Sequence, residues 1–140
     1  MKICVYGAGA IGGYLAVDMA LAGHDVTVIA RNKNLEAIRK NGLKLIIGGE
    51  ERIATNISVT DNPAEAGPQD YVFIATKSHQ AIDIVDILQP LLGPDTAVIT
   101  AQNGVPWWYF YALEGYTEPH FLESVDPGGV QWKTIGPERA

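Results

Sequence analysis

Residues 3–12 read ICVYGAGAIG, a short apolar run that passes directly into three glycines. An uninterrupted apolar run of this kind predicts a strand covered on both faces, as in a parallel sheet. Residues 10–22 favour a helix that stops at Gly23, and the β-branched run 26–30 predicts a second strand. A strand, a helix and a strand within about 30 residues predict a right-handed crossover between two parallel strands.

The same alternation continues for about 70 further residues. The apolar residues Ile84, Val85, Leu88, Leu91 and Leu92 fall on one side of a predicted helix that Gly93-Pro94 ends. The expected elements are a helix over 34–41 ended by Gly42, strands over 43–47 and 53–59 around the Gly48-Gly49 turn, a connection over 61–68 with one helical turn, a strand over 71–75, a helix over 80–92 and a strand over 97–100. We therefore expect an α/β fold, a single domain over residues 1–140 with a Rossmann-type, doubly wound and mostly parallel sheet.

The pattern changes after Asn103-Gly104. Five aromatic residues follow Pro106 directly, and residues 106–111 suggest a short helix with proline in its first turn. Residues 124–129 indicate a turn, and residues 130–133 a last short strand. We expect the aromatic run to pack, or to form an interface with a further domain, rather than to stack on nucleic-acid bases. Left uncovered, it would favour self-association, so a homo-oligomer is one expectation.

Composition and charge exclude several classes of protein. The chain has 47% hydrophobic and 19% charged residues, which is typical of a globular domain. Its net charge of −6 and scattered basic residues argue against nucleic-acid or membrane partners. The N-terminus starts on a strand with no charged leader, and no apolar run approaches the roughly 20 residues of a membrane span. The single cysteine, Cys4, is expected to be buried and inert, and the expected location is cytoplasmic.

The glycine loop Gly7-Ala8-Gly9-Ala10-Ile11-Gly12 predicts a dinucleotide-binding site. Gly7 allows the tight turn, Gly9 lets the backbone approach a pyrophosphate, and Gly12 lets the helix pack against the strand. The unpaired N–H groups of the helix N-terminus suit phosphate. A structural turn rich in glycine is the alternative, and the strand-helix-strand context weighs against it.

Arg31 decides which dinucleotide is expected. Domains that prefer NAD place Asp or Glu at the end of the second strand, whereas this chain has Ala30-Arg31-Asn32-Lys33 there. An arginine can pair with the 2′-phosphate of NADPH through charge-assisted hydrogen bonds. NADP(H) is therefore the predicted cofactor, and a solvated loop arginine is the alternative.

Lys77 and Asn103 follow two predicted strands, and ligands of open α/β sheets bind at the carboxyl ends of the strands. Placed near a nicotinamide, a lysine and an amide could orient a carbonyl or carboxylate. From spacing alone, a surface charge and an Asn-Gly turn explain them equally well.

Taken together, the glycine loop, Thr76-Lys77 and the sequence Gln102-Asn103-Gly104-Val105 resemble the 2-dehydropantoate 2-reductase (ketopantoate reductase) family over the whole chain. The resemblance implies an NADPH-dependent reduction of a small 2-keto acid, ketopantoate to pantoate, in pantothenate and coenzyme A biosynthesis. It implies that Arg31 binds the 2′-phosphate and that Lys77 and Asn103 lie near nicotinamide and substrate. The aromatic run resembles a subgroup of the family.

One departure from the family is large. Members are about twice as long, and their second, helical domain supplies the catalytic lysine that acts as general acid. No residue here corresponds to it, and Lys77 is not a substitute. We therefore expect this chain to be the N-terminal NADP-binding domain, inactive alone, with the C-terminal domain as a partner.

The histidines and the remaining acids suggest no further chemistry. We expect His24 and the pair Glu50-Glu51 to be solvated, His79 to belong to a loop or cap, and His120 to have no metal-binding neighbours, so no metal site is predicted. Two other functions stay open. One is a nucleotide-sensing Rossmann module without catalysis, and the other is a related dehydrogenase acting on another acid.

Overall fold

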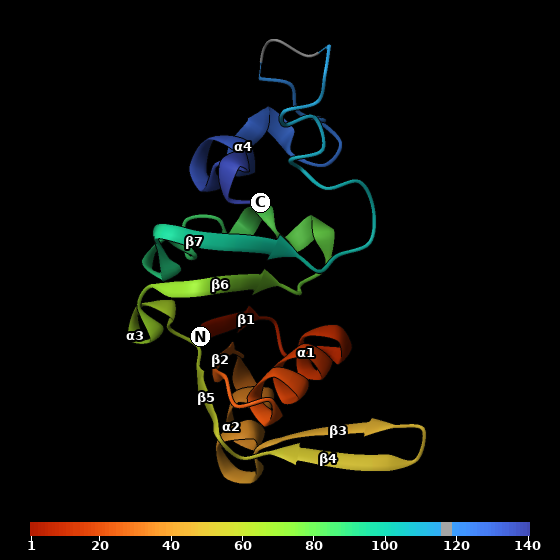
Figure 1. Cartoon of the computed structure of the whole chain (residues 1–140), viewed down its shortest axis with the longest axis vertical. Coiled ribbons are helices and arrows are strands. Elements are labelled where there is room, and N and C mark those ends of the chain that lie inside the picture. Colours follow the sequence, from red (N-terminus) through yellow and green to blue (C-terminus); the bar gives the residue numbers. More distant parts are fainter. Residues whose placement is uncertain (116–118) are drawn as a thin grey trace.

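Five parallel strands form the central sheet of the protein (Figure 1). The computed structural model describes residues 1–115 and 119–140. The strands lie in the order β5-β2-β1-β6-β7, and every neighbouring pair is parallel. Their bounds are β1 Lys2–Tyr6, β2 Asp25–Ile29, β5 Ile57–Thr60, β6 Gln69–Ile74 and β7 Leu92–Thr100. This arrangement confirms the Rossmann-type α/β fold.

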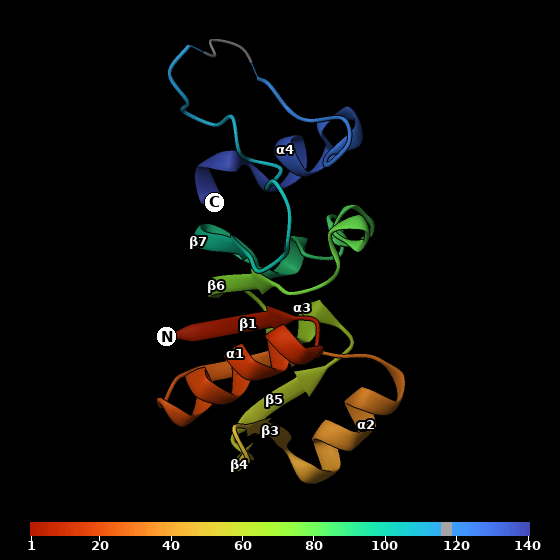
Figure 2. The same cartoon turned by 90° about the vertical axis from the view of Figure 1, so that its right-hand side faces the viewer.

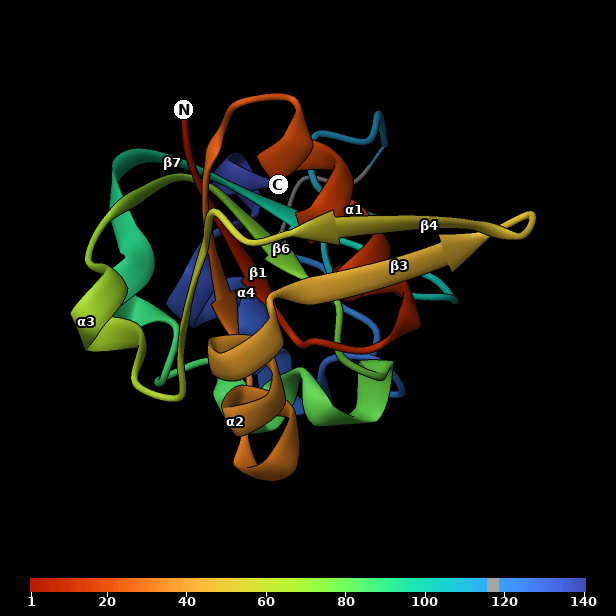
Figure 3. The same ribbon diagram turned by 90° about the horizontal axis from the view of Figure 1, so that it is seen from below.

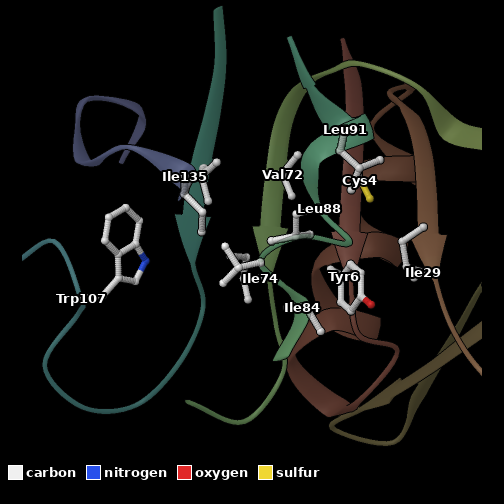
Figure 4. Close-up of a cluster of buried hydrophobic side chains, with 12 residues drawn as sticks. Cys4, Tyr6, Ile29, Val72, Ile74, Ile84, Leu88, Leu91, Trp107 and Ile135 are labelled. Atoms are coloured by element: carbon white, nitrogen blue, oxygen red, sulfur yellow. The ribbon is translucent and has the colours of Figure 1, made fainter. Parts of the chain in front are cut away.

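Alternate residues of the strands build a separate core on each face of the sheet. In β1, Ile3 and Val5 belong to the cluster that contains α1 (Ala10–Leu21) and α2 (Asn32–Asn41). Cys4 and Tyr6 point to the opposite face, where they join Leu88 and Trp107 of later segments (Figure 4). Both faces are therefore covered, which explains why the strands read as continuous apolar runs.

The predicted hairpin is present, but it stands outside the main sheet. β3 (Leu43–Ile47) and β4 (Glu50–Ala54) pair antiparallel and project from the body of the protein (Figure 3). The expected single strand over 53–59 is wrong, because the chain leaves the hairpin at Thr55-Asn56 and then pairs with β2 as β5. Arg52, in the middle of β4, contacts Asp18 of α1 at 2.6 Å and so ties the hairpin to this helix.

The helix predicted over 80–92 is also wrong. Short 3₁₀ turns occupy the segment instead, at Ser78–Gln80, Ile82–Ile84 and Gln89–Leu91. Pro90 explains part of the difference, because proline lacks an N–H donor and clashes with the preceding turn of an α-helix. The apolar side of the segment is nevertheless buried as expected, since Ile84, Val85, Leu88 and Leu91 pack on the sheet.

The last quarter of the described chain differs most from expectation. Residues 106–111 form successive turns rather than a helix, and residues 130–133 lie in a helix, α4 (Val130–Ile135), rather than a strand. The buried carboxylate of Asp126 explains α4, because it accepts the N–H groups of Gln131 and Trp132 at 2.8 and 2.9 Å. Figure 2 shows α4 beyond β7, at the opposite end of the molecule from α2.

Three shorter segments complete the fold. The expected helical turn after Asn62 is present as α3 (Pro63–Ala66). Single 3₁₀ turns flank α4 at Pro127–Gly129 and Pro137–Arg139. None of the helices that the structure describes combines the length and apolar character needed to cross a membrane.

Candidate functional site

A cleft of about 520 Å³ opens at the carboxyl ends of β1 and β2. Because all five strands are parallel, the loops that follow them meet at one edge of the sheet. The cleft is lined by the start of the glycine loop, the turn after β2 and the 3₁₀ segment after β6. Its lining residues are Tyr6, Gly7, Ala8, Ile29, Ala30, Arg31, Asn32, Asn34, Thr76, Gln80, Asp83, Ile84 and Ile87.

Two glycines of the loop are required by the fold itself. Gly7 has a φ of 112°, a conformation that other residues rarely adopt. A Cβ on Gly12 would lie 1.9 Å from the carbonyl oxygen of Gly7, so only glycine allows α1 to pack this closely against the loop. Gly7 thus allows the tight turn after β1, and Gly12 allows the close contact between α1 and the glycine loop.

Gly9 is different, because the fold makes no demand on it. A Cβ on Gly9 would meet no atom of the protein within 4 Å. Gly9 is also the residue before α1, whose first-turn N–H groups have no carbonyl partner within the helix. The structure therefore offers open space beside unpaired donors and the positive end of a helix dipole, which fits a pyrophosphate.

Arg31 follows β2 at the mouth of the cleft and is exposed. Its Nη2 donates a hydrogen bond of 2.9 Å to the hydroxyl oxygen of Tyr6. In the described part of the chain, the guanidinium forms no ion pair with a carboxylate. An arginine without an ion pair in the described part of the chain thus lines the same cleft as the glycine loop.

Lys77 and Asn103 lie in neighbouring loops after β6 and β7, and both are exposed. Gln102 joins these loops, since its Nε2 donates to the carbonyl oxygen and hydroxyl of Thr76 at 3.0 and 3.2 Å. Asn103 borders a small hollow of about 20 Å³ together with Ser78, the neighbour of Lys77. Neither Lys77 nor Asn103 lines the larger cleft.

Sequence reasoning missed Tyr6, Gln80 and Asp83. The sequence predicts Tyr6 only as part of a strand, and Asp83 and Gln80 as part of a helix, because nothing local marks a residue as facing a cleft. Gln102 belongs to the sequence motif that carries the family resemblance, but no sequence signal indicates its contact with Thr76.

Other residues stay outside the cleft. His79 and the pair Glu50-Glu51 are exposed, whereas His24 is partly buried, and the ring of His120 packs edge-on against Phe110. Across residues 1–115 and 119–140, no three His, Cys, Asp or Glu side chains come together as a metal site. Burial raises the pKa of the Cys4 thiol to about 12, so the thiol is protonated and inert at neutral pH, as predicted.

The aromatic run divides between core and surface. Trp107 is 2% exposed and packs in the core cluster that contains Cys4 and Tyr6, whereas Tyr109 and Tyr111 are about half exposed. Core packing therefore explains the aromatic residue at the start of the run, whereas Tyr109 and Tyr111 expose part of their rings on the surface.

Comparison with known proteins gives one consistent family. The family described as Ketopantoate reductase PanE/ApbA matches residues 3–106. A 2-dehydropantoate 2-reductase from Mesorhizobium japonicum is 51% identical over 140 residues, which cover 99% of this chain and 43% of that protein. The chain thus spans less than half the length of this relative.

Solved structures agree with the sequence comparison. A crystal structure from Ralstonia solanacearum MolK2, assigned as a ketopantoate reductase, has a TM-score of 0.88 and 38% identity over 98% of this chain and 42% of that one. A D-mandelate dehydrogenase, solved with NADH and anilino(oxo)acetate, has a TM-score of 0.66 and 27% identity over 76% of this chain and 35% of that one.

Proposed function

This chain belongs to the ketopantoate reductase family, and we propose that it is the part of such an enzyme that binds NADPH. Proteins of this family are oxidoreductases that use a pyridine nucleotide. One observation carries the proposal: the glycine loop and Arg31 line a single cleft at the carboxyl edge of the sheet. Phosphates and a 2′-phosphate are the anions that this pair of features would bind.

In this proposal the pyrophosphate lies over Gly9 at the N-terminus of α1. Gly7, Ala8, Ala10, Ile11 and Gly12 complete the loop around it, through backbone groups and close packing. Arg31 binds the 2′-phosphate, because its planar fork matches phosphate oxygens and it forms no ion pair with a carboxylate of the described chain.

The substrate side is proposed to lie toward Lys77 and Asn103. Bound NADPH would supply the hydride, and these two side chains would orient the carbonyl or carboxylate of a small 2-keto acid such as ketopantoate. The Gln102 contacts to Thr76 support this role, since they hold the two loops together. The general acid would come from the part of the relatives that this chain does not cover. The proposed location is the cytoplasm, where a lone buried thiol stays reduced.

A second candidate is a dehydrogenase of similar fold that acts on another 2-keto acid with NADH. The likeness to the D-mandelate dehydrogenase solved with NADH favours it. The two candidates differ in the role of Arg31, which has a partner on NADPH but none on NADH.

Isothermal titration calorimetry of NADPH and NADH with this chain tests the proposal. We expect tighter binding of NADPH, and Arg31→Ala should weaken NADPH by about 10- to 100-fold, as for a lost charged hydrogen bond, with little change for NADH. Arg39→Ala is the matched control, since Arg39 is an exposed arginine of α2 outside the cleft. Equal affinity for the two nucleotides would exclude NADPH specificity and favour the second candidate.

Turnover is a separate measurement. NADPH oxidation with ketopantoate should be compared between this chain and the same chain extended by the remaining part found in its relatives. We expect turnover only in the extended protein. Turnover by the 140-residue chain alone would show that the general acid lies within it.

A further inference from the structure

Tyr6 is the last residue of β1 and directly precedes the glycine loop. Its side chain is 4% exposed, and its ring lies among Ile29, Ile74 and Ile84 (Figure 4). The hydroxyl group of this side chain accepts a hydrogen bond from Nη2 of Arg31 at 2.9 Å. Tyr6 and Arg31 both line the cleft.

The position of this hydroxyl group is fixed by the centre of the sheet. β1 pairs with a strand on each side, and Tyr6 lies opposite Ile29 of β2 and Ile74 of β6. The N–H of Ala75 also donates to the Tyr6 carbonyl oxygen at 2.9 Å. A side chain on a doubly paired strand is a rigid anchor, in contrast to the loop that carries Arg31.

A phenol is also a suitable partner chemically. It is a neutral acceptor, so it orients the guanidinium without cancelling its charge, as a carboxylate would. One N–H is used by Tyr6, and the remaining N–H donors of the guanidinium stay available to an anion. A flexible exposed arginine otherwise loses much rotational freedom when it binds a phosphate.

We propose that Tyr6 is a positioning residue for nucleotide specificity: it holds the Arg31 guanidinium ready for the 2′-phosphate of NADPH. The inference rests on the proposed function and adds a second residue to it. Tyr6 acts through Arg31, and it does not contact the phosphate in this proposal. Because NADH has no 2′-phosphate, its affinity should not depend on the Tyr6 hydroxyl group.

Calorimetry on a double-mutant cycle tests the inference. The proteins are the wild-type chain, Tyr6→Phe, Arg31→Ala and the double variant, each titrated with NADPH and with NADH. We expect Tyr6→Phe to weaken NADPH by about three- to tenfold, a typical effect of one lost hydrogen bond, and NADH by less than twofold. In the Arg31→Ala background, Tyr6→Phe should have no further effect on NADPH.

Two further variants separate positioning from a general structural role. Tyr71→Phe removes the hydroxyl group of a partly exposed tyrosine of β6 outside the cleft, and it should change neither affinity. Arg31→Lys leaves the packing of Tyr6 intact and keeps the charge, but it removes the planar fork that the phenol orients. It should weaken NADPH at least as much as Tyr6→Phe, and it serves even if Tyr6→Phe unfolds.

The outcomes distinguish this inference from the proposed function. A wild-type chain that binds NADPH no better than NADH refutes the proposed function, and the inference with it. A wild-type preference for NADPH that is not reduced in Tyr6→Phe, or not reduced in Arg31→Lys, overturns the inference alone. Equal losses for both nucleotides in Tyr6→Phe would also overturn it, because they would reflect damage to the whole cleft.

Discussion

Because Gly12 packs closely against Gly7, we predict that substitution of Gly12 by alanine lowers the free energy of unfolding. In Gly12→Ala, the new Cβ would lie 1.9 Å from the Gly7 carbonyl oxygen, and contacts of such carbons below 3.0 Å are essentially never observed. The obstacle is backbone rather than a side chain that can rotate away. Either the start of α1 or the glycine loop must therefore move.

The expected cost follows from two opposing effects. Overpacking of a tight contact costs about 1–3 kcal/mol, and a backbone obstacle places this case near 3 kcal/mol. Alanine is a better helix former than glycine and returns roughly 1 kcal/mol. The net loss is about 2 kcal/mol in the free energy of unfolding, which for a chain of this size lowers the melting temperature by about 4–8 °C.

Gly13 provides the matched control in the same helix turn. A Cβ on Gly13 meets no atom within 4 Å, so Gly13→Ala should raise stability by about 0.5–1 kcal/mol through helix propensity alone. Urea unfolding followed by far-UV circular dichroism measures both variants against the wild-type chain. Gly12→Ala that unfolds at or above the wild-type midpoint would show that close packing is not the reason for glycine at this position.

Three further predictions concern ligand binding, the C-terminal segment and the buried thiol. Gly9→Ala should leave the unfolding midpoint within the error of the measurement, because the new methyl group meets no protein atom. The same methyl group enters the space that the cofactor would use, so NADPH affinity measured by calorimetry should fall at least about tenfold. Unchanged affinity would place the pyrophosphate elsewhere. Asp126→Ala should cost about 2–3 kcal/mol in urea unfolding, since it leaves the N–H groups of Gln131 and Trp132 without their acceptor, and a loss within about 0.5 kcal/mol would mean that α4 does not depend on this cap. Burial raises the pKa of Cys4, so the folded state favours the protonated thiol; this contribution to stability is complete below pH 9 and is lost as the pH rises from 9 toward about 12. In urea unfolding, the wild-type chain should therefore lose more stability over this pH range than Cys4→Ala. Equal losses would contradict the raised pKa of the buried thiol.

Local sequence determined the glycine loop and the strands around it. The apolar run before Gly7 is covered on both faces, and glycine spacing sets the turn and the helix start, so these elements depend on neighbours within a few residues. Cys4 was placed correctly for the same reason, because it falls inside a run that could only be a buried strand. The family resemblance also depended on these local motifs.

Tertiary contacts decided the segments that local patterns described wrongly. The apolar side of residues 80–92 was correct, but a regular helix was not, because burial fixes which side chains face the sheet and leaves several backbone paths open. Val130 to Lys133 fit a strand by composition, whereas the buried Asp126 carboxylate holds them as the start of α4.

In the candidate site, too, some features follow from the sequence and others only from the tertiary structure. Sequence alone predicted a phosphate-binding loop and singled out Arg31, since each lies at a readable position after a strand. Only the tertiary structure decided that Tyr6 and Arg31 meet, because they are 25 residues apart and the register of β1 with β2 brings them together. Which neighbour orients a charged side chain depends on strand pairing, and pairing is a property of the folded chain.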